Sequence, residues 1–142
     1  MIIVSACLAG INSRYDGKNK KKEEIIELVK EGKAIPLCPE LLGGLPVPRE
    51  PAEIETGDGR EVLNKKARVV NAGGEDITKK YLEGANKVLS TAQILGCKEA
   101  ILMEGSPSCG VNYIRRGGEK VPGLGVCSAL LLLHGISVTG LE

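Results

Sequence analysis

Aromatic residues are scarce in this chain, which has no tryptophan, no phenylalanine and only three tyrosines, Tyr15, Tyr81 and Tyr113. A platform of rings for stacking successive nucleic-acid bases is hard to build from so few. Neither sign of charge dominates, because 19 Lys and Arg face 18 Asp and Glu, which leaves a formal net charge of +1. The composition therefore gives no electrostatic basis for binding nucleic acid or a membrane surface.

Long hydrophobic runs are missing as well, since no apolar stretch approaches the roughly 18 residues that a membrane span needs. The first residues, MIIVSACLAG, lack the basic segment that precedes the apolar part of a secretion signal. We therefore expect a cytoplasmic protein. Its 142 residues, 42% hydrophobic and 26% charged, predict one globular domain spanning 1–142.

Cysteine, in contrast, is frequent. The chain has five, an odd number, and the absence of a secretion signal argues against a disulfide framework. They are therefore buried structural thiols, metal ligands or catalytic groups. Their positions are Cys7, Cys38, Cys97, Cys109 and Cys127.

Apolar patterning predicts alternating strands and helices. Short apolar runs typical of buried strands cover 2–6, 34–37, 99–103 and 136–139. Helical spacing predicts helices at 22–31, at 77–95 after an Asp76 cap, and at 126–133. Long stretches without periodicity predict functional loops at 40–60 and 104–125, and 61–70 favours a hairpin or a strand at 67–70. The fold class we expect is α/β, a single Rossmann-like domain whose mainly parallel sheet carries helices on both faces.

Three cysteines follow predicted strands. Cys7 and Cys38 come directly after the first two, and Cys109 lies in the loop that leaves 99–103. Because the carboxyl ends of parallel strands meet at one edge, we expect these three thiols to converge. Cys97 precedes a strand at the opposite edge and is expected to be a buried small hydrophobe, whereas Cys127 stays ambiguous.

Converging thiols suit a soft metal centre, either zinc with an open position or an iron–sulfur cluster with one iron lacking a protein ligand. The single histidine, His134, follows the apolar helix and offers no help, which favours iron–sulfur. The alternative is that the three cysteines only pack at strand ends. Pro39, Pro107 and Gly110 favour the rigid, closely approached loops of a ligand site.

Several segments resemble one known family. They are SACLAG at 5–10 with RYDG at 14–17, LCPELLGGLPVPREPAE at 37–53 and SPSCG at 106–110. Together they are similar to the thiouracil desulfidase family, many of whose members were long grouped as a domain of unknown function. The likeness runs from about residue 3 to 138, nearly the whole chain.

The resemblance implies a 4Fe–4S cluster held by only three cysteines, which match Cys7, Cys38 and Cys109. In the family, the open iron takes the sulfur of a thiolated pyrimidine and water replaces that sulfur without net redox change. The catalytic carboxylate and hydroxyl fall on Glu40 and Ser106. An aerobic preparation can lack the cluster.

The matched segments also supply the residues expected to bind substrate, namely Arg14, Tyr15, Arg49 and Ser108. The expected partner is a thiolated uracil base or nucleotide, with no membrane partner and no stable nucleic-acid complex. Plainer interpretations stay open: Glu40 can pair with Arg49, Ser106 can only shape a turn, and Arg14 and Arg49 can hold loops together. The basic run at 18–22 suits an anion or a solvated loop.

Two positions depart from the family. Met103 and Glu104 stand where a basic residue is common, and Cys127 stands where a hydroxyl residue is more usual. If Cys127 were a fourth ligand, no iron would be open and desulfidation would be lost. Two alternative functions therefore remain, a cluster-based sulfur carrier and a non-catalytic metal or redox-sensing module.

Overall fold

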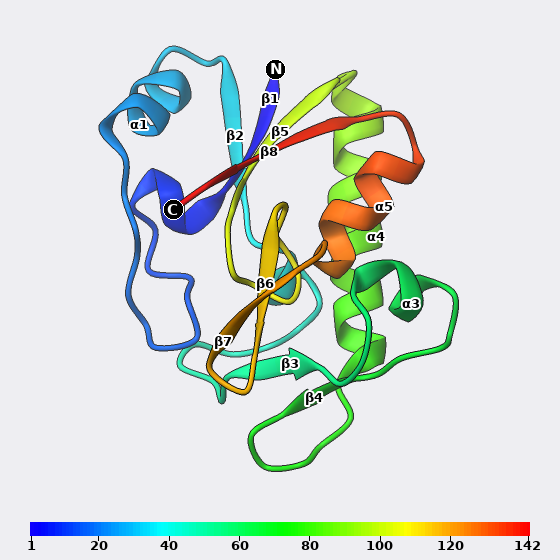
Figure 1. Cartoon of the computed structure of the whole chain (residues 1–142). Helices are drawn as coiled ribbons and strands as arrows, with labels where there is room; N and C mark the ends of the chain where they lie inside the picture. The colour runs from blue at the N-terminus through cyan, green and yellow to red at the C-terminus, as the bar shows by residue number, and fades with distance from the viewer.

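A parallel sheet of four strands forms the centre of the fold. The computed structural model describes residues 1–142, and the sheet order is β2 (Ala34–Leu37), β1 (Ile2–Ser5), β5 (Glu99–Met103) and β8 (Ser137–Leu141), shown in Figure 1. All three neighbouring pairs are parallel. The strands match the four apolar runs of the sequence to within two residues, so the prediction of a mainly parallel α/β sheet is confirmed.

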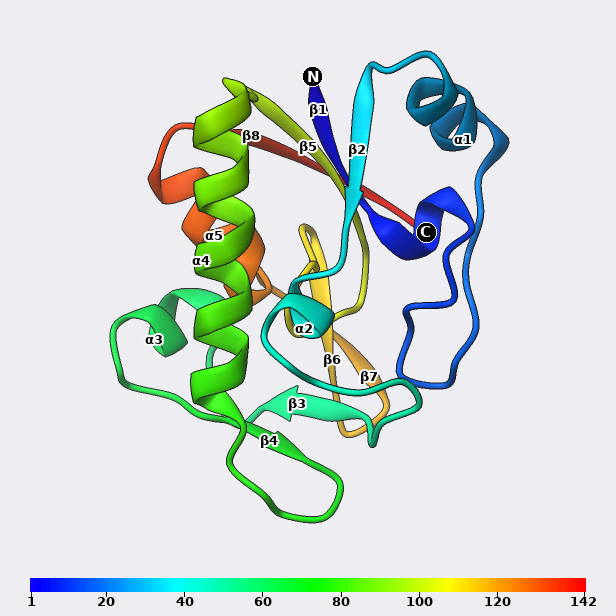
Figure 2. The same cartoon turned by 180° about the vertical axis from the view of Figure 1, so that it is seen from behind.

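Helices cover both faces of this sheet, as Figures 1 and 2 show. One face carries η1 (Ala6–Ala9, a 3-10 turn) and α1 (Glu23–Lys30), and the other carries α4 (Thr78–Leu95) and α5 (Val126–Leu133). Side chains of β1 alternate accordingly. Ile3 belongs to the large core with α4 and α5, whereas Val4 packs with Leu8 and Ile25.

The long helix α4 begins one residue after its predicted start. Ile77 is the N-cap by backbone conformation, and Asp76 assists from outside, where its carboxylate accepts hydrogen bonds from the amide and the hydroxyl of Thr78. No helix in the structure is both long and apolar enough to cross a membrane.

Both stretches predicted to be loops contain short regular elements. Residues 40–60 overlap α2 (Pro39–Leu42) and include β3 (Ala52–Ile54), and 104–125 include the hairpin of β6 (Tyr113–Arg116) and β7 (Glu119–Pro122). Each has only three or four residues, which is too short for hydrophobic periodicity to show.

The prediction for 61–70 was partly wrong. Its beginning belongs to a helix, α3 (Gly59–Leu63), and only β4 (Val69–Asn71) is a strand, paired antiparallel with β3. The reason is a capping box: the Asp58 carboxylate accepts the Arg60 amide N–H, while the Glu61 carboxylate accepts the Asp58 N–H.

Asp58 also links α3 to the segment before α5, because its carboxylate accepts the Leu124 amide N–H at 2.9 Å. Burial alone would favour the neutral acid, yet hydrogen bonds from Arg60 and Leu124 outweigh it and lower the pKa of Asp58 to about 2. Since this lies below the pKa of the unfolded chain, the stabilisation is present above about pH 4 and is lost as the pH falls toward 2.

We expect Asp58→Asn to lower the free energy of unfolding at pH 7 by about 1–2 kcal/mol. It should also flatten the decline in stability between about pH 4 and pH 2. Urea unfolding at a series of pH values measures both effects. An equally steep decline in the variant would show that other carboxylates govern acid stability.

Candidate metal and substrate site

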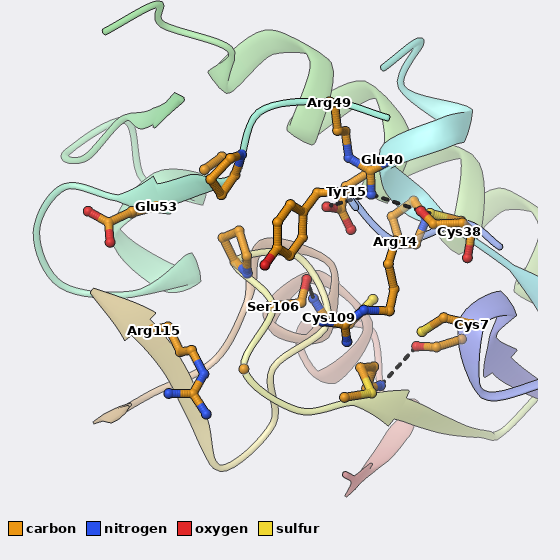
Figure 3. Close-up of a pocket in the computed structure, with 18 of the residues that line it drawn as sticks. Cys7, Arg14, Tyr15, Cys38, Glu40, Arg49, Glu53, Ser106, Cys109 and Arg115 are labelled. Carbon is orange, nitrogen blue, oxygen red and sulfur yellow. Dashed lines mark hydrogen bonds and ion pairs between the residues drawn. The ribbon is translucent and has the colours of Figure 1, made fainter. Parts of the chain in front are cut away.

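The three cysteines that follow parallel strands line one cavity. Cys7 lies in η1 directly after β1, Cys38 directly follows β2 and begins α2, and Cys109 lies in the loop after β5. Because β2, β1 and β5 are adjacent and parallel, their carboxyl ends meet at the same edge. Figure 3 shows the three side chains on one side of the cavity, the convergence expected from topology.

Cys7 and Cys109 are buried and Cys38 is half-buried, which favours the neutral form of the three thiols. Burial raises the pKa of Cys7 to about 11, and the Arg14 guanidinium partly offsets the increase. Burial likewise raises the pKa of Cys38, and it raises that of Cys109 well above its usual value. A metal centre that binds here must displace their protons.

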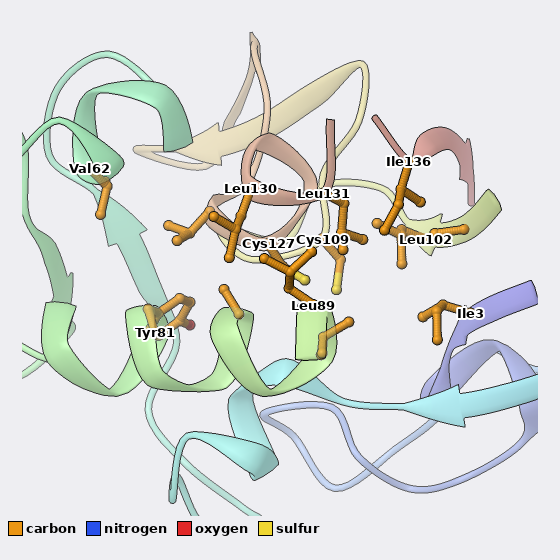
Figure 4. Close-up of a cluster of buried hydrophobic side chains, with 14 of the residues drawn as sticks. Ile3, Val62, Tyr81, Leu89, Leu102, Cys109, Cys127, Leu130, Leu131 and Ile136 are labelled. Atoms are coloured by element: carbon orange, nitrogen blue, oxygen red, sulfur yellow. The ribbon is translucent and has the colours of Figure 1, made fainter. Parts of the chain in front are cut away.

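Cys97 and Cys127 lie outside the cavity lining. Cys97, between α4 and β5, is a buried member of the large core, as predicted. Cys127 is fully buried in the first turn of α5, and Figure 4 shows it beside Cys109 among apolar side chains. Burial raises the pKa of the Cys127 thiol.

The cavity has a volume of about 840 Å³, within the range of small-molecule and cofactor sites. The thiols, Glu40 and Ser106 lie on one side of it, and Glu53 of β3 and Arg115 of β6 lie across the opening (Figure 3). From the basic run at 18–22, Lys20 alone contributes to the lining. Charged groups of both signs therefore surround the entrance.

Glu40 is held at the cavity wall by one of its oxygens. Its Oε2 accepts hydrogen bonds from Arg49 Nη2 and from the Tyr81 hydroxyl, both at 3.2 Å. The Arg49–Glu40 ion pair is largely buried, with 7% and 13% of the two side chains exposed. The other oxygen, Oε1, has no partner in the protein and is not a buried unpaired atom, so it is open to the cavity.

Ser106 shapes the loop that carries Cys109. Its Oγ accepts the amide N–H groups of Ser108 and Cys109 at 3.0 and 3.1 Å, while its own hydroxyl proton has no acceptor in the protein. Two N–H bonds to one hydroxyl oxygen polarise it and strengthen it as a donor. The residue therefore forms a turn and lines the cavity with its hydroxyl proton unengaged by the protein.

Ser108 does not join the other predicted binding residues. It is fully buried, it lies outside the cavity lining, and its Oγ has no hydrogen-bond partner. The physical reason is its backbone, whose carbonyl accepts the amide N–H groups of Cys127 and Ser128 at the start of α5. The Ser128 hydroxyl donates to the Cys109 carbonyl, so α5 fixes this loop from behind.

The structure places Arg14, Tyr15 and Arg49 in the cavity lining. Tyr15 is 41% exposed at the entrance, and the Arg14 guanidinium lies 5.8 Å from the centre of its ring. The terminal N–H groups of Arg49 donate hydrogen bonds within the protein, to the Pro46 and Ser13 carbonyls and to the Glu40 carboxylate. It joins the loop before β3 to the Ser13 loop and to α2, as the plainer interpretation has it.

The Glu104 side chain fixes the loop between β5 and β6. This buried carboxylate accepts the amide N–H groups of Val111, Asn112 and Tyr113 and the side-chain amide of Asn112. These bonds tie the end of β5 to the start of β6 and enclose the loop that holds Ser106 and Cys109. The departure from a basic residue therefore has a structural consequence here.

Sequence reasoning missed Tyr81 as a site residue, because its helical spacing assigns it to the core. It is a core residue, 2% exposed, and its hydroxyl nevertheless reaches Glu40 across the cavity wall. The available signal was chemical: a buried tyrosine hydroxyl needs a partner.

The donor set fits an iron–sulfur cluster. Three thiols line the cavity without histidine, since the His134 ring lies at the end of α5 against the Leu130 carbonyl. Arg14 and Arg49 each keep a buried Nε without a hydrogen-bond partner, and N–H donors near cluster sulfur tune such centres.

The parallel sheet thus brings three cysteines from its strand ends to one cavity. Comparison with known proteins gives the family. A family model described as 2-thiouracil desulfurase matches residues 2–142, and the chain belongs to this family.

Two proteins are similar to this chain over nearly its whole length. The solved structure of the [4Fe-4S]-dependent thiouracil desulfidase TudS superposes with a TM-score of 0.86 at 42% identity, covering 98% of this chain and 89% of the other. Uncharacterized protein YbbK of Bacillus subtilis (strain 168) is 50% identical over 141 residues, 97% of this chain and 93% of YbbK. The predicted family resemblance is confirmed.

Proposed function

We propose that this chain, acting as one domain of residues 1–142, removes sulfur from a thiolated uracil base or nucleotide. The observation that carries the proposal is the meeting of Cys7, Cys38 and Cys109 in one cavity of a 2-thiouracil desulfurase family member. These cysteines would hold a 4Fe–4S cluster. The cluster, when bound through three cysteines, supplies an iron without a protein ligand, a thiophilic Lewis acid that polarises the C–S bond and accepts the departing sulfur.

The reaction is a hydrolysis in its atom balance: a thiocarbonyl and water give a carbonyl and hydrogen sulfide, with no electrons transferred. Glu40 would take the proton of the attacking water on Oε1, the oxygen that faces the cavity. The Ser106 hydroxyl, whose oxygen is engaged by two backbone N–H groups, would give its proton to the substrate sulfur and regain one from the added hydroxyl as the carbonyl forms. Glu40 would then pass its proton to the departing sulfur, which completes hydrogen sulfide.

Binding of the pyrimidine would use Tyr15 and Arg14 at the entrance. The exposed Tyr15 ring offers a flat face for a heteroaromatic base, and the Arg14 guanidinium offers donors to its carbonyl or sulfur. Arg49 would contribute by holding Glu40 in place. A cytoplasmic location, with no membrane partner and no stable nucleic-acid complex, completes the proposal.

The test is anaerobic reconstitution with iron and sulfide, followed by addition of thiouracil and, separately, its monophosphate. We expect thiolate-to-iron absorption, loss of the thiocarbonyl absorbance, and one sulfide released per pyrimidine formed. Glu40→Gln should keep the cluster absorption and lower kcat by about 10²–10⁴-fold.

Three other outcomes would contradict parts of this proposal. A cluster that forms without turnover would contradict the desulfidase and favour the sulfur carrier or the sensing module. Failure of any cluster to form would contradict the metal assignment. Ligation by four cysteines, including Cys127, would contradict the proposed three-cysteine ligation and its open iron.

A further inference from the structure

Two hydrogen-bond donors from different segments of the chain hold the Glu40 carboxylate in place. Arg49 approaches Oε2 from the loop before β3, where its other N–H groups are fixed by the Ser13 and Pro46 carbonyls. Tyr81 approaches the same oxygen from the first turn of α4. Two donors on one oxygen fix the plane of the carboxylate and leave Oε1 facing the cavity.

Tyr81 is well suited to this task. Its ring is packed in the large core, so the hydroxyl cannot swing away, and its one hydrogen bond in the protein goes to Glu40. Burial, reinforced by the nearby Glu40 carboxylate, raises the pKa of Tyr81 well above its usual value. The hydroxyl therefore keeps its proton and remains a donor.

We infer that Tyr81 is a positioning residue for desulfidation, acting on the reaction through Glu40. Its hydroxyl holds the carboxylate in the orientation that directs Oε1 at the attacking water. This inference rests on the proposed function. Without the hydroxyl, only Arg49 would hold Oε2, and the carboxylate could rotate out of the productive geometry.

The variant that tests it is Tyr81→Phe, which keeps the ring in the core and removes only the hydroxyl. We expect kcat to fall by about 10- to 100-fold, as for small misplacements of a catalytic group. The KM for the thiopyrimidine, the affinity for the uracil product measured by calorimetry, the cluster absorption and Tm should all stay unchanged. Thr91→Val is the matched control, since it removes a hydroxyl from the same helix whose bond goes to the Lys87 carbonyl.

A double-mutant cycle identifies the route of the effect. In a Glu40→Ala background, Tyr81→Phe should cause no further loss, because the group it positions is gone. A further loss there would overturn the inference and indicate direct contact with substrate. Unchanged kcat in Tyr81→Phe alone would overturn it too, as would a parallel loss of cluster or Tm.

The same series separates this inference from the proposed function. Absence of turnover by the unmodified, cluster-loaded chain would overturn the desulfidase proposal and the inference with it. Normal turnover by both the unmodified chain and Tyr81→Phe would overturn only the inference.

Discussion

Cys38→Ala is expected to abolish both cluster incorporation and desulfidation. Cys38 is one of three thiols in the cavity, and it comes directly after β2 as the N-cap of α2. No histidine lines the cavity, and Cys127, the nearest spare thiol, lies outside the lining. A substitute ligand is therefore lacking, and two thiols cannot retain the cluster. Absorption and iron content after anaerobic reconstitution measure the loss.

The matched control is Cys97→Ala. This residue is also a buried cysteine, 4% exposed, but it lies at the other edge of the sheet in the apolar core. It should cost about 1 kcal/mol of stability or less and leave cluster content and kcat unchanged. Retention of the cluster in Cys38→Ala, or its equal loss in Cys97→Ala, would contradict the three-cysteine site.

The convergence of the three cysteines could be predicted from sequence because it follows from topology alone. Apolar runs identified the strands, parallel order placed their ends together, and each cysteine stood directly after a strand or in the loop that leaves it. No side-chain detail was needed. The same reasoning excluded Cys97 from the converging set, because it precedes a strand.

Within the SPSCG motif, sequence could not assign the serines. Ser106 and Ser108 are both small hydroxyl residues near a proposed ligand, yet only Ser106 lines the cavity. The difference arises from the turn, in which the Ser106 oxygen accepts two amide N–H groups while the Ser108 carbonyl is taken by α5. The Ser108 carbonyl bonds come from a helix some 20 residues further along the chain, which no local pattern reports.

For Glu40, the sequence left open a pairing with Arg49, which the structure shows, whereas the contact with Tyr81 was beyond local pattern. Arg49 pairs with it across nine residues and Tyr81 across 41, and the second contact exists only because α2 packs on α4. The predicted helix at 77–95 includes Tyr81, but helical spacing does not indicate which group its hydroxyl contacts. Glu104 is similar, because its partners are mostly backbone N–H groups, which carry no residue identity.

Two glycines allow the close packing of α2 on α4. A Cβ at Gly84 of α4 would collide with the Pro39 carbonyl oxygen, and one at Gly43, directly after α2, would collide with the Lys80 carbonyl oxygen. Both clashes involve backbone atoms, which cannot move aside as a flexible side chain can. The two backbones therefore touch at the segment that carries Cys38 and Glu40.

Gly84→Ala is consequently expected to disable the site. Helix propensity alone predicts the opposite, a gain of about 1 kcal/mol for alanine over glycine inside a helix. The added methyl must instead push α2 away, at a cost of about 1–3 kcal/mol for overpacking. Because α2 carries Glu40 and follows Cys38, its displacement should lower cluster content and reduce kcat by about 100-fold or more, even well below Tm.

Ser90→Ala is the control for this substitution, since it changes an exposed residue of the same helix to alanine and should leave stability and kcat near those of the unmodified chain. Thermal unfolding, iron content and steady-state kinetics on the three proteins give the comparison. A Gly84→Ala protein that is more stable and fully active would mean that α2 can shift without moving the site. The loss we expect would instead show that the Gly84 contact sets the position of Glu40, since propensity alone acts in the other direction.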